Sequence, residues 1–268
     1  MVLKFGFIGT GNMGGALAKA ARKGLPGEQL FLADHMQEKA AALANTLGCN
    51  ASSNTEIAAE CDYIFLGVKP QVLGSALAEI APVLAKRSSS FVLVSMAAGV
   101  SIADVQRMAG GEYPVIRIMP NTPVAVGSGM VLYAASPQVS EQAVHAFRVV
   151  MQHAGEFDAL AEHLIDAGSA VSGCGPAFAC LFMEALADGG VACGLPRDKA
   201  LQYAAYMLAG TAKLVVESGQ HPAALKDAVC SPGGSTIAGV QALEEGAMRG
   251  AVMNAVIDAF ERTKELGK

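Results

Sequence analysis

The first 160 residues alternate short apolar runs with stretches in which apolar side chains recur at helical spacing. A continuous apolar run is typical of a buried parallel strand, and a helical stretch between two runs is typical of a crossover connection. The strand-like runs lie at 2–8, 30–33, 63–66, 91–95 and 115–118, with weaker candidates at 49–52, 130–134 and 155–158. The helical stretches lie at 16–23, 37–47, 72–84, 102–108 and 141–152. This rhythm predicts an α/β fold with a doubly wound, mostly parallel sheet of the Rossmann type.

After about residue 160 the strand-like runs cease. The rest of the chain reads as helices at 162–171, 176–193, 197–217, 223–228, 236–245 and 250–266. Several of these helices are apolar on most faces, and such a helix needs a partner that covers it. We therefore expect a Rossmann domain over 1–160, a helical domain over 161–268, and a homodimer that forms through the helical domain.

A glycine-rich turn follows the first strand. Gly9, Gly11 and Gly14 have the spacing G-x-G-x-x-G, and a helical stretch begins directly after them. In dinucleotide-binding turns the first glycine allows the tight turn, the second lets the backbone approach the pyrophosphate, and the third lets helix and strand pack closely. Asp34 ends the second strand twenty positions after Gly14, where an acidic residue would meet the adenosine ribose. A glycine turn that merely joins strand to helix is the alternative, but the spaced acid favours a dinucleotide site.

Further candidate contacts lie where later strands end, because ligands of doubly wound sheets bind at the carboxyl ends of the strands. Lys69 follows one strand, and the small residues Ala97 and Ala98 follow the next. Asn121 lies between two prolines, and Asn54 can cap a helix. A solvated turn lysine and a merely rigid loop are the alternatives for Lys69 and Asn121. The candidate cofactor contacts are Gly9, Thr10, Gly11, Asn12, Met13, Gly14, Asp34, Asn54, Val68, Lys69, Pro70, Ala97, Ala98 and Asn121.

Composition narrows the class of protein. Hydrophobic residues make up 52% and charged residues 16% of the 268 residues, which argues against disorder. A net charge of -5 argues against a protein that binds nucleic acid, because such proteins are typically basic. No uninterrupted apolar run approaches the length of a membrane span; the nearest, 176–187, is broken by Glu184, so we expect no membrane contact. The sequence predicts no secretory leader, and its six cysteines form no C-x-x-C pair. We therefore expect reduced, mostly buried thiols and a cytoplasmic location. The histidine spacing predicts no metal site.

The helical half contains one loop with candidate chemistry. Residues 231–236, Ser-Pro-Gly-Gly-Ser-Thr, are small and lead directly into a helix. Free amide groups at such an entry can bind an anion, a carboxylate as well as a phosphate. Thr236 would add a hydroxyl at the mouth of that site. A glycine-rich helix entry with an ordinary cap is the alternative.

The same loop is part of a resemblance to the pyrroline-5-carboxylate reductase family. The segment that resembles the family's signature contains Pro222, Leu225, Val229, Ser231, Gly233, Gly234, Thr236, Leu243 and Glu244. The other matching motifs, in the family's order, are Phe7-Ile8-Gly9-x-Gly11-Asn12-Met13-Gly14, Val68-Lys69-Pro70, Ala97-Ala98-Gly99-Val100, Met119-Pro120-Asn121-Thr122-Pro123, Ser172-Gly173-x-Gly175-Pro176-Ala177 and Leu225-Lys226-Asp227. The resemblance therefore covers essentially the whole chain.

The resemblance implies reduction of 1-pyrroline-5-carboxylate to L-proline by NADPH or NADH, the last step of proline biosynthesis. It implies a helical dimerisation domain, and dimers that assemble into a decamer. It makes Thr236 the catalytic residue, because in such enzymes the matching hydroxyl bonds the ring nitrogen of the cyclic imine. The implied substrate-binding residues are Glu162, Ser231, Gly233, Gly234, Ser235 and Thr236.

Two other functions compete with this hypothesis. Related Rossmann enzymes oxidise hydroxy acids with a helical lysine, for which Lys199, Lys213 and Lys226 are candidates. A non-catalytic dinucleotide-sensing module would keep the glycine turn but would not need the 231–236 loop. The preferred cofactor stays open: Asp34 favours NAD, since a carboxylate there repels a 2′-phosphate, whereas members of the family frequently prefer NADPH.

Overall fold

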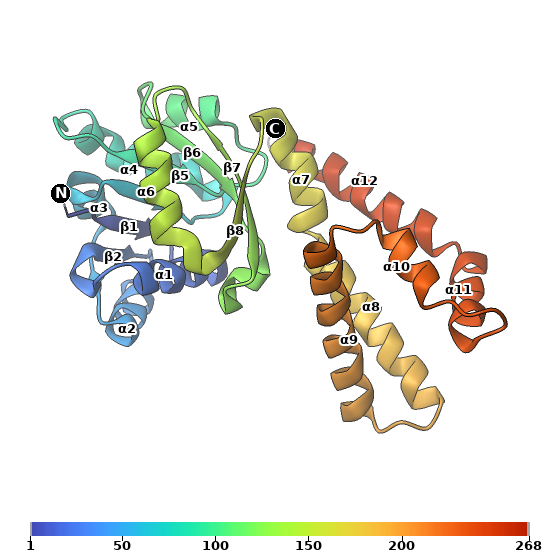
Figure 1. Cartoon of the computed structure of the whole chain (residues 1–268). Coiled ribbons are helices and arrows are strands. Elements are labelled where there is room, and N and C mark those ends of the chain that lie inside the picture. The colour runs from blue at the N-terminus through green and yellow to red at the C-terminus, as the bar shows by residue number, and fades with distance from the viewer. Residues whose placement is uncertain (1, 267–268) are drawn as a thin grey trace. The chain divides into compact units, whose positions relative to one another are not determined.

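The structure is a computed structural model that describes residues 2–266, and it contains an eight-stranded sheet (Figure 1). The strand order is β3-β2-β1-β4-β5-β6-β7-β8, and every neighbouring pair is parallel except β6 with β7. The strands are β1 (Phe5–Ile8), β2 (Leu30–Ala33), β3 (Asn50–Ala51), β4 (Tyr63–Leu66), β5 (Val92–Ser95), β6 (Val115–Met119), β7 (Gly129–Ala135) and β8 (Gly155–Ala159). The predicted doubly wound, mostly parallel sheet is confirmed.

Helices cover both faces of this sheet (Figure 1). Phe7 and Phe65 stack on one face, with ring centroids 4.2 Å apart, and pack among side chains of α1 and α6. Ile64 and Leu66 point to the opposite face, among side chains of α3, α4, α5 and α7. Because successive strand residues alternate between faces, both faces of these strands must be apolar, which explains the continuous runs in the sequence. The helices are α1 (Asn12–Gly24), α2 (Gln37–Leu47), α3 (Asn54–Glu60), α4 (Pro70–Leu84), α5 (Ile102–Ala109), α6 (Glu141–Met151) and α7 (Ile165–Ser172), with short 3-10 helices η1 (Gly27–Gln29), η2 (Thr122–Val126), η3 (Gln152–Ala154) and η4 (Glu162–Leu164).

Local signals set several helix ends. Gly48 ends α2 in the left-handed conformation, at φ 61°, as its position after the apolar pattern predicts. Ser53 and Ser101 cap α3 and α5 in capping boxes with Glu56 and Asp104. The prediction that Asn54 caps α3 is therefore wrong, because Asn54 is the first residue inside the helix. The starts of α3 and α5 are thereby fixed at the edge of the sheet where strands end.

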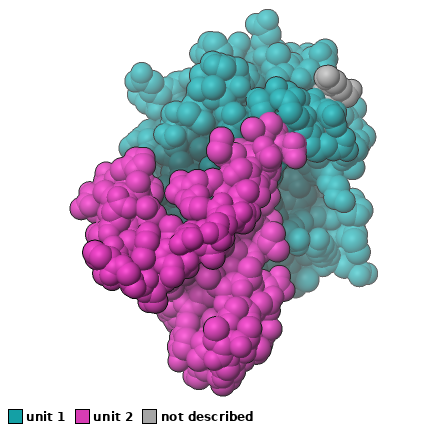
Figure 2. Space-filling model, turned by 90° about the vertical axis from the view of Figure 1, so that its right-hand side faces the viewer, with its two compact units in different colours: residues 1–174, 259–268 teal, residues 175–258 magenta. Residues whose placement is uncertain are grey.

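The chain divides into two compact units, which Figure 2 distinguishes. The first unit runs to Cys174 and includes the residues from Ala259 onward; the second is Gly175–Asp258. The division therefore falls after α7, whereas the predicted domain boundary falls before it, at residue 160. The physical reason is that α7 packs on the sheet, with Ile165 fully buried in the core that contains Leu132 of β7.

The second unit is helical and leaves much apolar surface exposed. Its helices are α8 (Gly175–Ala192), α9 (Arg197–Ser218), α10 (Pro222–Ala228), α11 (Ser235–Glu245) and the first part of α12 (Met248–Leu266). In α8 and α9 only Ala187, Ala200 and Ala204 are buried, while Leu181, Tyr206 and Val216 are exposed. A single copy of the chain therefore does not cover these helices.

One expectation from the sequence, that the thiols are mostly buried, is wrong for the single chain. Only Cys61 of the six cysteines is buried, while Cys180 and Cys193 lie exposed in the uncovered second unit. Desolvation raises the pKa of the Cys61 thiol to about 12. The stretch Glu162–Ala192 is long and apolar enough to cross a membrane by length and composition only. One such stretch is weak evidence for a membrane contact, and the structure divides it into η4, α7 and α8.

Candidate cofactor and substrate site

The glycine turn lies between β1 and α1, and each glycine has a different surrounding. Gly9 has a φ of 96°, which L side chains rarely adopt. A Cβ on Gly14 would lie 2.1 Å from the carbonyl oxygen of Gly9, so helix and strand are in direct backbone contact there. A Cβ on Gly11 would meet nothing within 4 Å. Gly11 is the N-cap of α1 and no side chain caps the helix, so the first amides of α1 are left uncapped, as an anion site at this entry requires.

Asp34 is hydrogen-bonded to the glycine turn. Its Oδ2 accepts hydrogen bonds from the amide of Thr10 at 2.7 Å and from the hydroxyl of Thr10 at 3.0 Å, and its Oδ1 accepts one from the amide of Met36 at 3.1 Å. Desolvation raises the pKa of Asp34, but the Thr10 and Met36 hydrogen bonds and the nearby His35 outweigh it, so the pKa lies below its usual range. Asp34 is therefore a carboxylate at neutral pH, at the position expected for an adenosine ribose.

A cavity of about 360 Å³ opens beside Asp34 at the carboxyl edge of the sheet. It brings together four predicted contacts, Gly9, Asp34, Asn54 and Val68. The rest of the lining includes residues of α4 that the sequence analysis does not predict. They lie at positions 72, 75, 76 and 79, and this helical spacing could have indicated that they share one face of α4. The lining residues are Ile8, Gly9, Asp34, His35, Asn54, Val68, Val72, Ser75, Ala76 and Glu79.

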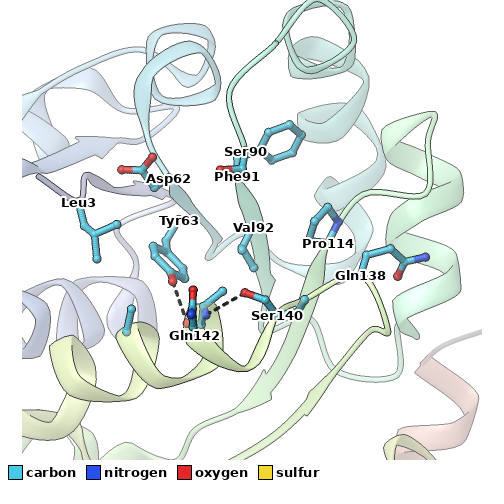
Figure 3. Close-up of a pocket in the computed structure, with 13 residues that line it drawn as sticks. Leu3, Asp62, Tyr63, Ser90, Phe91, Val92, Pro114, Gln138, Ser140 and Gln142 are labelled. Carbon is cyan, nitrogen blue, oxygen red and sulfur yellow. Dashed lines mark hydrogen bonds between the residues drawn. The ribbon is translucent and has the colours of Figure 1, made fainter. Parts of the chain in front are cut away.

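A second cavity, of about 300 Å³, lies at the opposite edge of the sheet, where strands begin (Figure 3). Tyr63 and Val92, the first residues of β4 and β5, line it, and the hydroxyl of Tyr63 donates to the carbonyl oxygen of Ala143 at 2.8 Å. Because ligands of doubly wound sheets bind at the carboxyl ends of the strands, the cavity beside Asp34 is the candidate for a dinucleotide, and this second cavity is not.

The turns after β4 and β5 also lie at the carboxyl edge. The amide of Gly67 donates to the carbonyl oxygen of Ile8 at 2.7 Å, which holds the β4 turn against the glycine turn. Lys69, the N-cap of α4, is exposed, and Pro70 begins the helix. Ala97 is buried and Ala98 is partly exposed after β5. Their contacts with a nicotinamide ring or ribose stay predictions.

Asn121 has a structural role in its loop. Its Nδ2 donates to the carbonyl oxygen of Ser172, and its Oδ1 accepts from the amide of Met130, both at 2.9 Å. Both ends of the amide are thus bonded to the protein, and the side chain joins the loop after β6 to β7 and α7. A contact between Asn121 and the cofactor stays a prediction.

Glu162 belongs to a charge network around the buried Arg117, which the sequence does not predict. Its Oε1 accepts a hydrogen bond from the amide of Ile102 at 2.6 Å and lies 3.7 Å from Nη1 of Arg117. Arg117, only 4% exposed, also pairs with Asp166 through Nη2. The Nε of Arg117 is the one buried side-chain nitrogen or oxygen without a partner among the described residues. The sequence feature that could have predicted this network is Arg117, a charged residue inside the apolar strand β6. The hydrogen bond from Ile102 to Glu162 fixes the start of α5, which follows the Ala97–Ala98 turn.

The network makes a prediction about Glu162. In Glu162→Gln the amide oxygen can still accept from Ile102, so kcat/KM for the imine is expected to change by less than about threefold, whereas Glu162→Ala is expected to lose about 1–3 kcal/mol of stability. Urea unfolding and steady-state kinetics on both variants measure these effects. A tenfold higher KM for the imine in Glu162→Gln, with stability retained, would instead support the substrate contact that the family resemblance implies.

The 231–236 loop joins α10 to α11 in the second unit. Gly233 has a φ of 68°, and the amide of Gly234 donates to the carbonyl oxygen of Ser231 at 3.0 Å. Gly234 is the N-cap of α11, and no side chain caps the helix, so the loop is not an ordinary side-chain cap. Ser235 and Thr236 form the exposed first turn of α11. The helix entry therefore has the uncapped amides that an anion site requires. Within residues 2–266 no group of three or more metal-ligating side chains is gathered.

The first unit has the parallel sheet, the open glycine turn and the acidic residue that define a dinucleotide-binding oxidoreductase domain. A profile described as NADP oxidoreductase, coenzyme F420-dependent, matches residues 4–99, and one described as pyrroline-5-carboxylate reductase dimerisation matches residues 162–266. The pyrroline-5-carboxylate reductase of Escherichia coli (strain K12) is 40% identical over 272 residues, which cover 100% of both chains.

Solved structures agree with these matches. The pyrroline carboxylate reductase of Plasmodium falciparum, crystallised with NADP bound, superimposes with a TM-score of 0.89 at 35% identity and covers 99% of this chain and 98% of its own. The pyrroline-5-carboxylate reductase of Coxiella burnetii superimposes with a TM-score of 0.90 at 27% identity over 100% of both chains. The chain belongs to the pyrroline-5-carboxylate reductase family.

Proposed function

We propose that this chain reduces 1-pyrroline-5-carboxylate to L-proline with NADPH or NADH, the last step of proline biosynthesis. The observation that carries the proposal is the uncapped entry of α11 with Thr236 in its first turn, on a chain whose other unit has an open dinucleotide turn. A dinucleotide-sensing module would need only the second of these features. Full-length similarity to reductases of this name supports the same reaction.

The residues of the chain perform three tasks in this reaction. The amides at 233–236 hold the substrate carboxylate, the Thr236 hydroxyl bonds the ring nitrogen, and the glycine turn with Asp34 holds the cofactor. The reduced nicotinamide, when bound, supplies the hydride. As the hydride adds to the imine carbon, the C=N electron pair moves onto nitrogen, and a ring nitrogen that is already protonated becomes the amine. Such an electrophile needs orientation and charge placement more than a strong acid.

The proposal is tested by following cofactor oxidation optically. Purified protein is expected to oxidise NADPH or NADH when 1-pyrroline-5-carboxylate is added. It is expected not to reduce NAD or NADP when small hydroxy acids are added. Turnover of hydroxy acids without turnover of the imine would replace the proposal by the hydroxy-acid alternative, in which Lys199, Lys213 or Lys226 would act.

Asp34 is expected to set the ratio in which the two cofactors are used. Its carboxylate accepts a ribose diol and repels a 2′-phosphate, and neither lysine nor arginine is among the residues that line the cavity. We expect both cofactors to work, and Asp34→Ser to raise the NADPH/NADH ratio of kcat/KM by about tenfold. Asp34→Asn, which keeps the shape and removes the charge, is expected to shift the ratio in the same direction. An unchanged or lower ratio in Asp34→Ser would contradict this role.

The oligomer and the location complete the proposal. The exposed apolar side chains of α8 and α9 and the dimerisation profile over residues 162–266 support a homodimer formed by the helical domain. We infer that dimers assemble into a decamer, and that the protein acts in the cytoplasm, where its six free cysteines stay reduced.

A further inference from the structure

The cavity beside Asp34 contains a polar pair, the predicted cofactor contact Asn54 and the unpredicted Glu79, and the proposed function does not say which part of the cofactor this pair meets. Nδ2 of Asn54, the first residue of α3, donates a hydrogen bond to Oε2 of Glu79 on α4 at 2.8 Å. Both side chains line the cavity together with Asp34. The pair therefore lies in the site where the adenosine half of a dinucleotide is expected.

The rest of the lining suits a purine ring. With the ribose on Asp34, the base must extend into the part of the cavity formed by Val68, Val72 and Ala76. These side chains are apolar and can pack against the faces of a planar ring. Hydrogen bonds to the ring edge must then come from the polar members of the lining, among them Asn54 and Glu79.

The pair of Asn54 and Glu79 offers hydrogen-bond acceptors, so a ligand group that binds to it must be a donor. A carboxylate only accepts, so the Asn54 amide nitrogen must face Glu79, and the carbonyl oxygen of Asn54 remains an acceptor for the ligand. Glu79 retains its second carboxylate oxygen as an acceptor as well. The pair thus offers two acceptors, and the matching group on adenine is the 6-amino group, which has two hydrogens to donate.

We propose that Glu79, together with Asn54, binds the 6-amino group of adenine and makes the enzyme select adenine dinucleotides over their deaminated forms. Hypoxanthine carries an oxygen in place of that amino group, so an acceptor would face the acceptors of the pair. This inference rests on the proposed dinucleotide function and specifies how the same site recognises the base.

Binding measurements without the imine substrate test the proposal. NADH and reduced nicotinamide hypoxanthine dinucleotide are titrated into the full chain, and dissociation constants are read from nicotinamide fluorescence. The hypoxanthine cofactor is expected to bind roughly fivefold or more weakly than NADH, because an oxygen acceptor replaces the amino donor opposite the pair. In Glu79→Gln the ratio is expected to fall to within about twofold, since the glutamine amide can donate to the hypoxanthine oxygen.

The matched control is Glu141→Gln, which changes an exposed glutamate on α6 outside the cavity lining and is expected to leave the wild-type ratio unchanged. Equal affinities for the two cofactors in the wild type would overturn the proposal. So would a ratio that is the same in Glu79→Gln as in the wild type, because Glu79 would then only orient Asn54. Failure of both dinucleotides to bind would overturn the proposed function itself, whereas tight NADH binding without discrimination would overturn only the role of Glu79.

Discussion

Replacing Thr236 by alanine is expected to lower kcat/KM for 1-pyrroline-5-carboxylate by about ten- to several-hundredfold, which corresponds to about 1.5–3 kcal/mol of transition-state stabilisation. The reason is the loss of the hydroxyl that we propose bonds the ring nitrogen while the charge of the nitrogen changes. Thr236 is exposed in the first turn of α11, where alanine is a better helix former, so stability should not fall. Cofactor affinity should barely change.

Steady-state kinetics with the imine varied, together with a fluorescence titration of the cofactor, measure this effect. Thr236→Ser restores the hydroxyl and is expected to recover most of the activity, which a merely helical role of the residue would not require. Full activity in Thr236→Ala would show that the residue only occupies a helix position.

Alanine substitutions at two glycines of the same turn are expected to have different effects, one on folding stability and the other on cofactor affinity. In Gly14→Ala the new Cβ would lie 2.1 Å from the carbonyl oxygen of Gly9, a backbone atom that cannot move aside without separating α1 from β1. The expected cost is about 3 kcal/mol of folding stability or more. In Gly11→Ala the Cβ meets no protein atom within 4 Å and φ is -63°, so the fold should lose less than about 1 kcal/mol.

Gly11→Ala is instead expected to raise the dissociation constant of NADH by about tenfold or more, because its Cβ takes the space of the pyrophosphate. Thermal unfolding and cofactor titration of both variants, with Gly74→Ala of α4 as a control whose Cβ has only an ordinary contact at 3.6 Å, separate the two effects. Normal cofactor binding in Gly11→Ala would mean that the pyrophosphate does not lie at this turn.

The central strands β1, β2, β4, β5 and β6 were predictable because they are buried on both faces. The apolar runs at 30–33 and 63–66 coincide with β2 and β4, and the run at 115–118 ends one residue before β6 does. The backbone of the glycine turn was predictable for a related reason, since Gly9 and Gly14 meet local backbone requirements. The contact of Asp34 with a ribose stays a prediction. The local sequence pattern is sufficient to predict a structural feature wherever the requirements of one strand, helix or turn decide which residue type stands there.

Pairings between distant segments were not predictable. The contacts of Glu162 with Ile102 and Arg117 join residues 60 and 45 positions apart, and the pairing of Glu79 with Asn54 depends on how α3 packs against α4. The place of α7 on the sheet likewise depends on tertiary packing, because its sequence resembles that of the helices after it. A helical pattern indicates that a helix forms, but not which neighbour buries it.

The most direct test of the proposed reaction follows the hydrogen itself. Purified protein is given 1-pyrroline-5-carboxylate and NADH or NADPH deuterated at the reactive carbon of the nicotinamide, and the product is analysed by chromatography and mass spectrometry. The proposal predicts L-proline that carries one deuterium, at the carbon that was part of the imine. Cofactor that stays reduced while the folded protein binds it, or proline without deuterium from cofactor deuterated on either face, would contradict the proposal.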